Sequence, residues 1–186
     1  MSLAGWRGLL RHVVILDKSL SASLTLPPSD ATFLWGALRH ATGVGAHLGD
    51  GILWLGISPL AYVLSGARGR REILVTAGAV LAAAGLVSAL KFLVHRQRPR
   101  LPDGKPSFYY TYDRYAFPSG HASRVFCIAT IIGATHPAWS LPLGGLACWV
   151  ALSRVMLGIH HVSDVLVGAA IGCGTGALAL CLVPPL

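Results

Sequence analysis

The chain has 186 residues, of which 54% are hydrophobic and only 12% are charged. Soluble domains carry about twice that charged fraction, so the composition excludes a water-soluble globular protein. Fifteen basic residues oppose seven acidic ones, which gives a formal net charge of +8. We therefore expect a basic integral membrane protein whose partner is the lipid bilayer, with no nucleic acid.

The first 48 residues are predicted to lie on the membrane surface. Apolar residues recur there at helical spacing: Trp6, Leu9, Val13, Leu16, Leu20 and Leu24. Polar residues fall elsewhere on the helical wheel: Arg7, Arg11, Asp17, Lys18 and Ser21. This pattern is typical of an amphipathic helix in the interface, with membrane anchoring as its simplest role. Pro27-Pro28 ends it, and Ser29 or Asp30 can cap a second short helix that runs to about His40.

Long uncharged stretches follow. Residues 73–90, 125–153 and 165–186 contain no Lys, Arg, Asp or Glu. About 20 apolar residues cross the roughly 30 Å hydrocarbon core of a bilayer, and a span in lipid satisfies its backbone as a helix. The sequence predicts about five transmembrane helices: Gly49 to Ser65, Glu72 to His95, Gly120 to Thr135, Ala138 to Leu157 and His161 to Val183. We expect an all-α polytopic bundle, with residues 1–48 interfacial and residues 49–186 forming one transmembrane domain.

The sequence contains no motif for a metal or a cofactor. Its four cysteines fall inside predicted spans without a CxxC pair, so they are predicted to be small buried hydrophobic residues. No glycine-rich nucleotide motif and no carboxylate cluster for magnesium or calcium is present. We therefore predict no metal and no cofactor.

Three polar groups stand at span ends. Lys91 and Arg98-Pro99 end the second span, and Pro118-Ser119-Gly120-His121 open the third. Ser153-Arg154 end the fourth span, and His160 and Asp164 begin the fifth. Because successive spans cross in opposite directions, all three groups are predicted to meet on one membrane face.

The residue types in these groups suit a phosphate-like oxyanion. Three cations can neutralise phosphoryl oxygens: Lys91, Arg98 and Arg154. Ser119 has the position of a helix N-cap, so the amides of Gly120 and His121 can face the same anion at the positive end of a helix. Together they can surround a phosphoryl group in its transition state.

His160 and Asp164 are four residues apart, so on a helix they share one face. A carboxylate in that place can hold one imidazole nitrogen while the other points outward, which orients a nucleophile or a base. His161 is three residues from Asp164, and spacing alone does not choose between the two histidines. His121 lies on a separate element and is available as an acid and base.

The three groups together resemble the signature of the type 2 phosphatidic acid phosphatase superfamily, which includes the vanadium haloperoxidases. The matching motifs are Lys91-x6-Arg98-Pro99, Pro118-Ser119-Gly120-His121 and Ser153-Arg154-x5-His160-x3-Asp164. The resemblance implies a metal-independent membrane phosphatase that works through a phosphohistidine. It assigns the nucleophile to His160 instead of His161, the orienting carboxylate to Asp164, and the acid and base to His121. It assigns phosphate binding to Lys91, Arg98, Ser119, Gly120 and Arg154.

A site at span ends suits a phosphate whose lipid tail stays in the bilayer. The substrates we expect are an isoprenyl diphosphate such as undecaprenyl diphosphate, phosphatidylglycerol phosphate, phosphatidic acid or a lipid A phosphate. Two alternatives stay open: a vanadate-dependent haloperoxidase, and a non-catalytic protein that binds or transports lipid phosphates. The sequence does not determine the oligomeric state.

The remaining polar residues leave several interpretations open. Residues 100–117 hold a cluster of aromatic side chains, which suits an interfacial belt or a lid over the site. Arg96, Arg100 and Arg124 suit either substrate contact or anchoring, and we interpret the other histidines as packing residues: His12, His40, His47, His95, His136 and His161.

The membrane orientation depends on basic residues in the connections. Arg68, Arg70 and Arg71 are predicted to crowd a short loop opposite the site, which by the positive-inside rule is cytoplasmic. The basic residues before the first span argue for the reverse, but an interfacial helix uses such residues for headgroups of either leaflet. We predict a bacterial inner membrane protein with its site on the external or periplasmic face.

Overall fold

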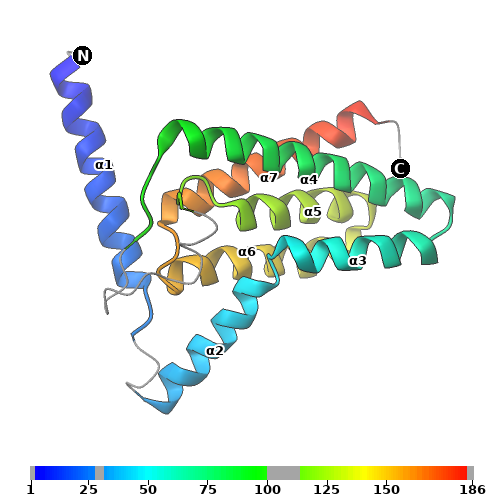
Figure 1. Ribbon diagram of the computed structural model, residues 1–186, viewed down its shortest axis with the longest axis horizontal. Helices are drawn as coiled ribbons and strands as arrows, with labels where there is room; N and C mark the ends of the chain where they lie inside the picture. Colours follow the sequence, from blue (N-terminus) through cyan, green and yellow to red (C-terminus); the bar gives the residue numbers. More distant parts are fainter. Residues whose placement is uncertain (1–2, 28–31, 100–113, 184–186) are drawn as a thin grey trace.

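The computed structural model describes residues 3–27, 32–99 and 114–183, and these residues form a helical protein (Figure 1). Its elements are α1 (Leu3–Leu24), α2 (Phe33–His47), α3 (Gly51–Leu64), α4 (Ala67–Val94), α5 (Gly120–Thr135), the short 3-10 helix η2 (Pro137–Trp139), α6 (Ser140–Met156) and α7 (Val162–Leu182). Across the described ranges the extended pairing consists of a single bridge between Gln97 and Tyr115. The predicted all-α class is confirmed.

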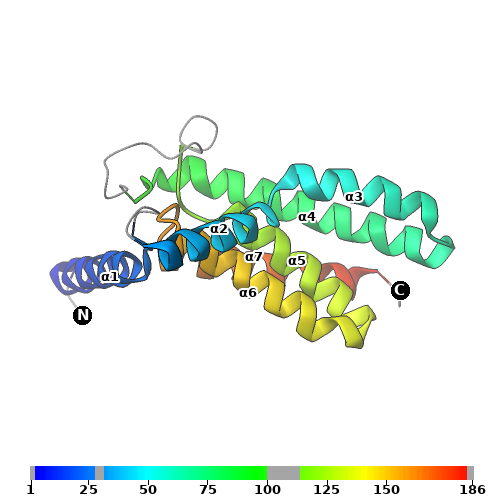
Figure 2. The same cartoon turned by 90° about the horizontal axis from the view of Figure 1, so that it is seen from below.

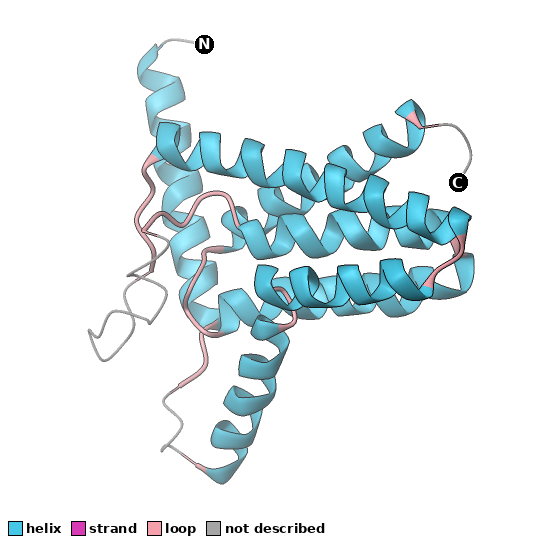
Figure 3. Ribbon diagram, turned by 45° about the vertical axis from the view of Figure 1, so that its right-hand side comes forward, coloured by secondary structure: helices cyan, strands magenta, loops and turns pink. Residues whose placement is uncertain are grey.

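Helix α5 lies at the centre of a bundle formed with α4, α6 and α7, and α3 runs beside α4 (Figures 1 and 2). Helix α5 has buried side chains on the side that faces α6 and on the side that faces α4. Val125 packs with Ala147 and Val150 of α6, whereas Cys127 packs with Ala79 of α4. The ends of α4 and α6 and the starts of α5 and α7 lie at the end of the bundle from which α1 and α2 project (Figures 1 and 3).

Helices α5 and α7 approach each other along a row of glycines. A Cβ atom added at Gly168 would collide with the carbonyl oxygen of Ser119, and one at Gly172 with the carbonyl oxygen of Ser123. Gly176 faces α5 in the same way one helical turn further on. Small residues at such a crossing let two backbones touch.

The five predicted spans are all helical, and their ends differ from the prediction by a few residues. The largest difference is at α4, which begins at Ala67 instead of Glu72, so that Arg68, Arg70 and Arg71 lie in its first turns and not in a loop. A helix of 28 residues is about 42 Å long, so it extends beyond the hydrocarbon core and its charged first turns reach the polar region. Arg70 also packs over the ring of Tyr62.

The N-terminal helices differ from the prediction in length and in packing. Helix α2 continues to His47, past the predicted end near His40, and Thr32 caps it by accepting a hydrogen bond from the Trp35 N–H at 3.2 Å. The predicted caps Ser29 and Asp30 lie outside the described residues. In α1 the apolar positions are exposed as expected, but Ser21 is buried against the start of α7.

Within the described residues, α4 and α7 are long and apolar enough to cross a membrane, and α3 is a shorter apolar helix. The predicted number of five spans is therefore not established by helix length and composition. The cysteine prediction is wrong for three of four residues: Cys127 is buried, whereas Cys148, Cys173 and Cys181 are exposed on the outer faces of their helices. Spans in lipid are apolar on all sides, so apolar character there does not indicate burial.

Candidate active site

The structure brings the three polar groups of the sequence to one end of the bundle. The N–H of Ser119 donates to the carbonyl oxygen of Asp164 at 2.9 Å, which joins the second group to the third. Nη1 of Arg98 lies 3.3 Å from the carbonyl oxygen of Ile159 and 3.4 Å from Nε2 of His160, which joins the first group to the third. The predicted convergence is therefore observed.

His160 is buried, with 1% of its surface exposed. Its spacing from Asp164 predicts that both lie on one helix, but His160 precedes α7 in a turn where Gly158 has a φ of 66°. This left-handed conformation suits glycine. The Arg154 carbonyl oxygen accepts from the N–H groups of Ile159 and His160, which fixes the turn. Nδ1 of His160 then lies 3.6 Å from Oδ2 of Asp164, an ion-pair distance longer than a hydrogen bond.

Burial lowers the pKa of His160 to about 3, and the cations Arg98 and Arg154 act in the same direction against the effect of Asp164. An imidazole with such a pKa is neutral at physiological pH. Because Nδ1 faces Asp164, Nε2 is the nitrogen that faces Arg98. A neutral ring with Nε2 beside a guanidinium group can attack a phosphoryl group bound there.

Asp164 is fully buried and accepts hydrogen bonds through both of its oxygens. Oδ2 accepts from the backbone N–H of His161 at 2.8 Å, and Nδ1 of the His161 ring lies 3.3 Å from the same oxygen. His161 and Asp164 form a capping box at the start of α7. His161 therefore contacts the candidate site, and its interpretation as a packing residue was incomplete.

Arg96 is a site residue whose role the sequence analysis left open. Its Nη1 donates to Oδ1 of Asp164 at 2.8 Å, and its Nη2 donates to Asp17 of α1 at 2.5 Å. Asp17 also accepts from the N–H of Ser163 at 2.9 Å. Burial raises the pKa of Asp17, but the hydrogen bonds from Arg96 and Ser163 outweigh it, so the pKa is lowered.

Helix α1 is therefore part of the site's support, because its polar face contacts the start of α7. The signal for this contact was visible in the sequence as an acidic residue, Asp17, on a helix that otherwise carries basic residues. Which residue it meets could not be predicted, because Arg96 is 79 residues away in the chain.

The predicted phosphate-binding cations differ in exposure. Arg98 and Arg154 are buried, with 4% and 0% of their surfaces exposed. Two guanidinium groups at this end of the bundle give it a positive potential, which favours an anion. Lys91 is half-buried and lines a cavity that Gly120 also lines.

Ser119 is the N-cap of α5, as predicted, and its Oγ accepts from the Ala122 N–H at 3.5 Å. Gly120 and His121 follow in the first turn, where backbone amides carry the positive end of the helix dipole. Nε2 of His121 lies 2.6 Å from Oδ1 of Asp50, which precedes α3. Asp50 could not be found from the sequence, because no local pattern links it to His121.

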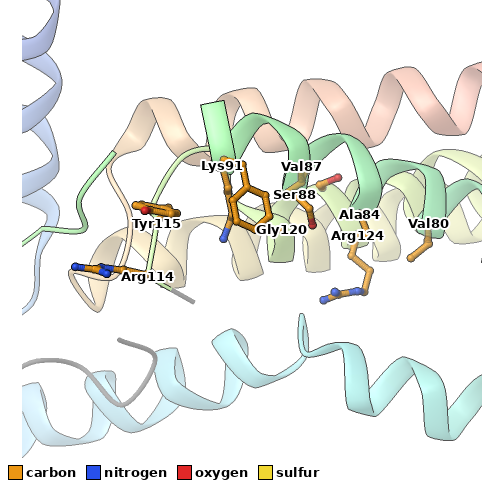
Figure 4. Close-up of a pocket in the computed structure, with 11 residues that line it drawn as sticks. Val80, Ala84, Val87, Ser88, Lys91, Arg114, Tyr115, Gly120 and Arg124 are labelled. Carbon is orange, nitrogen blue, oxygen red and sulfur yellow. The ribbon is translucent and has the colours of Figure 1, made fainter. Parts of the chain in front are cut away.

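Two cavities adjoin these residues. The first has a volume of about 450 Å³ and joins a polar end near Lys91 and Gly120 to an apolar wall that includes Val80 and Val87 (Figure 4). The second has a volume of about 520 Å³ and lies beside α1, where Lys18 and Arg98 contribute to its lining. Of the aromatic residues in 100–117, those up to residue 113 lie outside the described residues, and Tyr115 lines the first cavity.

None of the described residues form a group of three or more His, Cys, Asp or Glu side chains that could hold a metal ion.

The family model of the PAP2 superfamily matches residues 72–186. A decaprenylphosphoryl-5-phosphoribose phosphatase of Mycobacterium tuberculosis is 37% identical over 145 residues, which cover 77% of this chain and 78% of that protein. A lipid A 1-phosphatase of Porphyromonas gingivalis is 35% identical over 98 residues, which cover 50% of this chain and 20% of that protein.

The fold is also found in a solved structure. It is similar to a transmembrane PAP2-type phosphatidylglycerolphosphate phosphatase from Bacillus subtilis, with a TM-score of 0.71 and 23% sequence identity. The match covers 92% of this chain and 86% of that chain. The helical arrangement is therefore shared with this protein.

Proposed function

The chain belongs to the PAP2 superfamily, and on that premise we propose that it is an integral-membrane, metal-independent lipid phosphatase that works through a phosphohistidine. The two sequence relatives reported above are phosphatases, and both are named for phosphates linked to a lipid. The observation that carries the proposal is the position of His160, buried between Arg98 and Asp164 with Nε2 on the side of the arginine.

In the first step, Nε2 of His160 attacks the phosphorus atom, and the bond from phosphorus to the lipid oxygen breaks. Asp164 stabilises the ring as it gains positive charge, as a carboxylate does in a nucleophile–base–acid triad. His121 donates a proton to the departing oxygen. The charge on the phosphoryl oxygens is neutralised by the cations and by the amides at the start of α5: Lys91, Arg98, Arg154, Ser119 and Gly120.

In the second step, water attacks the phosphorus atom of phosphohistidine 160. His121, which lost its proton in the first step, removes one from the water. The bond from phosphorus to Nε2 breaks, and inorganic phosphate leaves with His160 restored. Both protons are accounted for within the cycle, since the one given to the lipid alcohol is replaced by the one taken from water.

For the substrate we propose a phosphate carried by a membrane lipid, with a polyprenyl-linked phosphate as the first choice. The Mycobacterium tuberculosis relative, which aligns over most of its length, is named for decaprenylphosphoryl-5-phosphoribose. The cavity beside Lys91 supports this choice, because its polar end adjoins Gly120 and its apolar wall continues along α4 (Figure 4).

For the membrane arrangement we propose five spans, formed by α3 to α7, with residues 1–48 at the interface and residues 49–186 as the transmembrane domain. The exposed apolar side chains of α1 support its interfacial position, among them Trp6, Val13 and Leu16. We place the protein in a bacterial inner membrane with its site on the external face. Placing Arg68, Arg70 and Arg71 at the opposite end of α4 supports this orientation.

The function is tested by phosphate release from purified protein in the presence of EDTA. The panel contains decaprenylphosphoryl-5-phosphoribose, undecaprenyl diphosphate, phosphatidylglycerol phosphate, phosphatidic acid and lipid A. We expect turnover that EDTA does not abolish, the highest kcat/KM for a polyprenyl substrate, and loss of activity in His160→Ala. A phosphohistidine is stable in base and labile in acid. We therefore expect a ³²P-labelled substrate to give the wild-type protein a label with these two properties, and to give His160→Ala none. A wild-type protein without such a label contradicts the phosphohistidine.

The orientation is tested with single cysteines in a protein whose four native cysteines are replaced by alanine. Arg114→Cys lies at the site end, and Ala138→Cys lies in η2 at the other end; both positions are exposed. In intact cells whose outer barrier is permeable to the reagent, we expect an impermeant thiol reagent to label residue 114 and not residue 138. The reverse pattern contradicts an external site.

A further inference from the structure

A second carboxylate–imidazole pair lies outside the three signature groups. Oδ1 of Asp50 is 2.6 Å from Nε2 of His121, although the two residues are 71 positions apart in the chain. Asp50 stands between α2 and α3, two helices that contribute no residue to the signature. Helix α2 packs on α6 and α3 packs on α4, and the contact is made by the short turn that joins these two helices beside the start of α5.

The carboxylate of Asp50 does not perform the role its position in the chain would suggest. Asp50 is the N-cap residue of α3, and an N-cap aspartate ordinarily accepts hydrogen bonds from the free N–H groups of its own helix. Here the side chain makes no capping hydrogen bond. Its two oxygens face two histidines instead: Oδ1 faces His121, and Oδ2 lies 2.7 Å from Nδ1 of His47.

The backbone beside Asp50 is held firmly against α5. Nη1 of Arg124 donates to the carbonyl oxygen of Gly49 at 2.5 Å. A Cβ atom at Gly49 would lie 2.8 Å from Cγ1 of Val150 and 3.0 Å from Cδ2 of His121, so only a glycine permits this approach. The ring of His121 thus lies close beside Gly49 as well as next to the carboxylate.

The pair is more open than the one at His160. The side chain of His121 is 16% exposed, that of Asp50 is 30% exposed, and that of His47 is 68% exposed. The three side chains thus lead from the candidate site to the surface. The charged groups that act on His121 are Asp50, Arg124 of its own helix and Arg154 of α6.

From this geometry we propose that Asp50 is a positioning residue for His121, a role that rests on the proposed function. Asp50 accepts a hydrogen bond from the N–H at Nε2, which fixes the ring's orientation and tautomer, and the proton exchanged with the lipid oxygen and with water is carried on Nδ1. A carboxylate acts in this way on the general base of a catalytic triad. His47 is the outer partner that holds the carboxylate in place.

The role is tested by separating the two chemical steps with p-nitrophenyl phosphate, whose leaving group departs without an acid. In Asp50→Asn we expect p-nitrophenol to appear in a burst of one equivalent at nearly the wild-type rate, since attack by His160 is intact. The steady turnover then falls by a factor of about 10 to 100, because the attack of water needs His121 as its base. A general base contributes about 10² to 10⁴ in total, and Asp50→Asn removes only the part that depends on its orientation. With a lipid phosphate both steps slow. Asp50→Glu restores part of the rate.

The matched control is Glu72→Gln. Glu72 contacts His136 at 3.0 Å and Thr135 at the opposite end of α5, so the substitution removes the same kind of pair far from the site. We expect its burst and steady turnover to match the wild type. Two results for Asp50→Asn overturn the positioning role. One is a burst that shrinks in parallel with the steady turnover, and the other is a steady turnover within threefold of the wild type. If the wild-type protein itself shows neither burst nor turnover, the proposed function fails instead.

Discussion

Two histidine–aspartate pairs lie at the same end of this protein, and they are built differently. The buried pair, His160 and Asp164, has side chains that are 1% and 0% exposed, and its members are four residues apart. The rim pair, His121 and Asp50, has side chains that are 16% and 30% exposed, and its members are 71 residues apart.

The difference in burial matches a difference in task. A nucleophilic imidazole has to be neutral, and burial among cations keeps His160 so by lowering its pKa. An acid–base imidazole has to exchange protons with a leaving group and with water, and a more open position permits that exchange. The arrangement of the supports differs as well, since Asp164 is held by Arg96 and by backbone, whereas Asp50 is held by a surface histidine.

The largest effect is expected from breaking the buried pair. Asp164→Asn removes the charge that stabilises the His160 ring and leaves Arg96 without its buried carboxylate. We expect kcat to fall by about 10³ to 10⁴, since the equivalent change in a serine-protease triad costs about 10⁴. Phosphate release from a lipid substrate measures it. His161→Gln is the control, because it leaves His160 and Asp164 in place, and an equal loss there contradicts the assignment of His160.

A smaller effect is expected from the outer support of the buried pair. Asp17→Asn weakens the ion pair that holds Arg96 against Asp164, so the carboxylate is less well oriented. We expect kcat to fall about tenfold, which corresponds to about 1.4 kcal/mol of barrier, with KM nearly unchanged. Arg11→Gln on the same helix is the control. If Asp17→Asn changes KM alone, α1 acts on substrate access and not on Asp164.

The distance between the two pairs depends on the contact of α5 with α7, which Gly168→Ala disturbs. The new methyl group meets the carbonyl oxygen of Ser119, next to the turn that leads to His121. We expect a destabilisation of about 1–3 kcal/mol, seen as a lower midpoint of thermal unfolding in detergent, together with reduced kcat. Gly174→Ala adds its methyl group in open space on the same helix, so it should lower neither the midpoint nor kcat. An unchanged midpoint in Gly168→Ala means that α7 can move away without cost.

The smallest effect is on the pH dependence of stability. The pKa of His160 is lowered from 6.5 to about 3 by folding, so below pH 6.5 the unfolded chain binds a proton that the folded protein does not. His160 therefore destabilises the fold increasingly as the pH falls from 6.5 toward 3. We expect His160→Gln to lose less thermal stability than the wild type between pH 6.5 and pH 5. Parallel curves for the two proteins contradict a buried neutral ring.

Much of the fold and of the buried pair could be predicted because both depend on local patterns. The uncharged stretches mark α4 to α7 within a few residues, and the predicted cap Ser119 begins α5. The contact of His160 with Asp164 was predicted from helical spacing, although a turn fixed by Gly158 produces it. Spacing succeeded here because residues four apart are close in either conformation.

The rim pair and the support from α1 could not be predicted in this way. Asp50 with His121, and Asp17 with Arg96, join residues 71 and 79 positions apart. Helices that are apolar on all sides carry no pattern that tells which face meets which neighbour. The basic N-terminal segment likewise suggests a surface anchor, and no local pattern shows that Asp17 of α1 meets Arg96 and so supports a buried carboxylate.

The amino-acid sequence alone thus determined that this protein is a helical bundle with three polar groups at one end, because hydrophobicity and span direction are properties of single segments. The tertiary structure decided how those groups are held. It placed Asp50 beside His121 and Arg96 between Asp17 and Asp164, because glycines at 49, 168 and 172 allow backbones to approach closely. Such contacts depend on the fit between segments, which only the packed structure specifies.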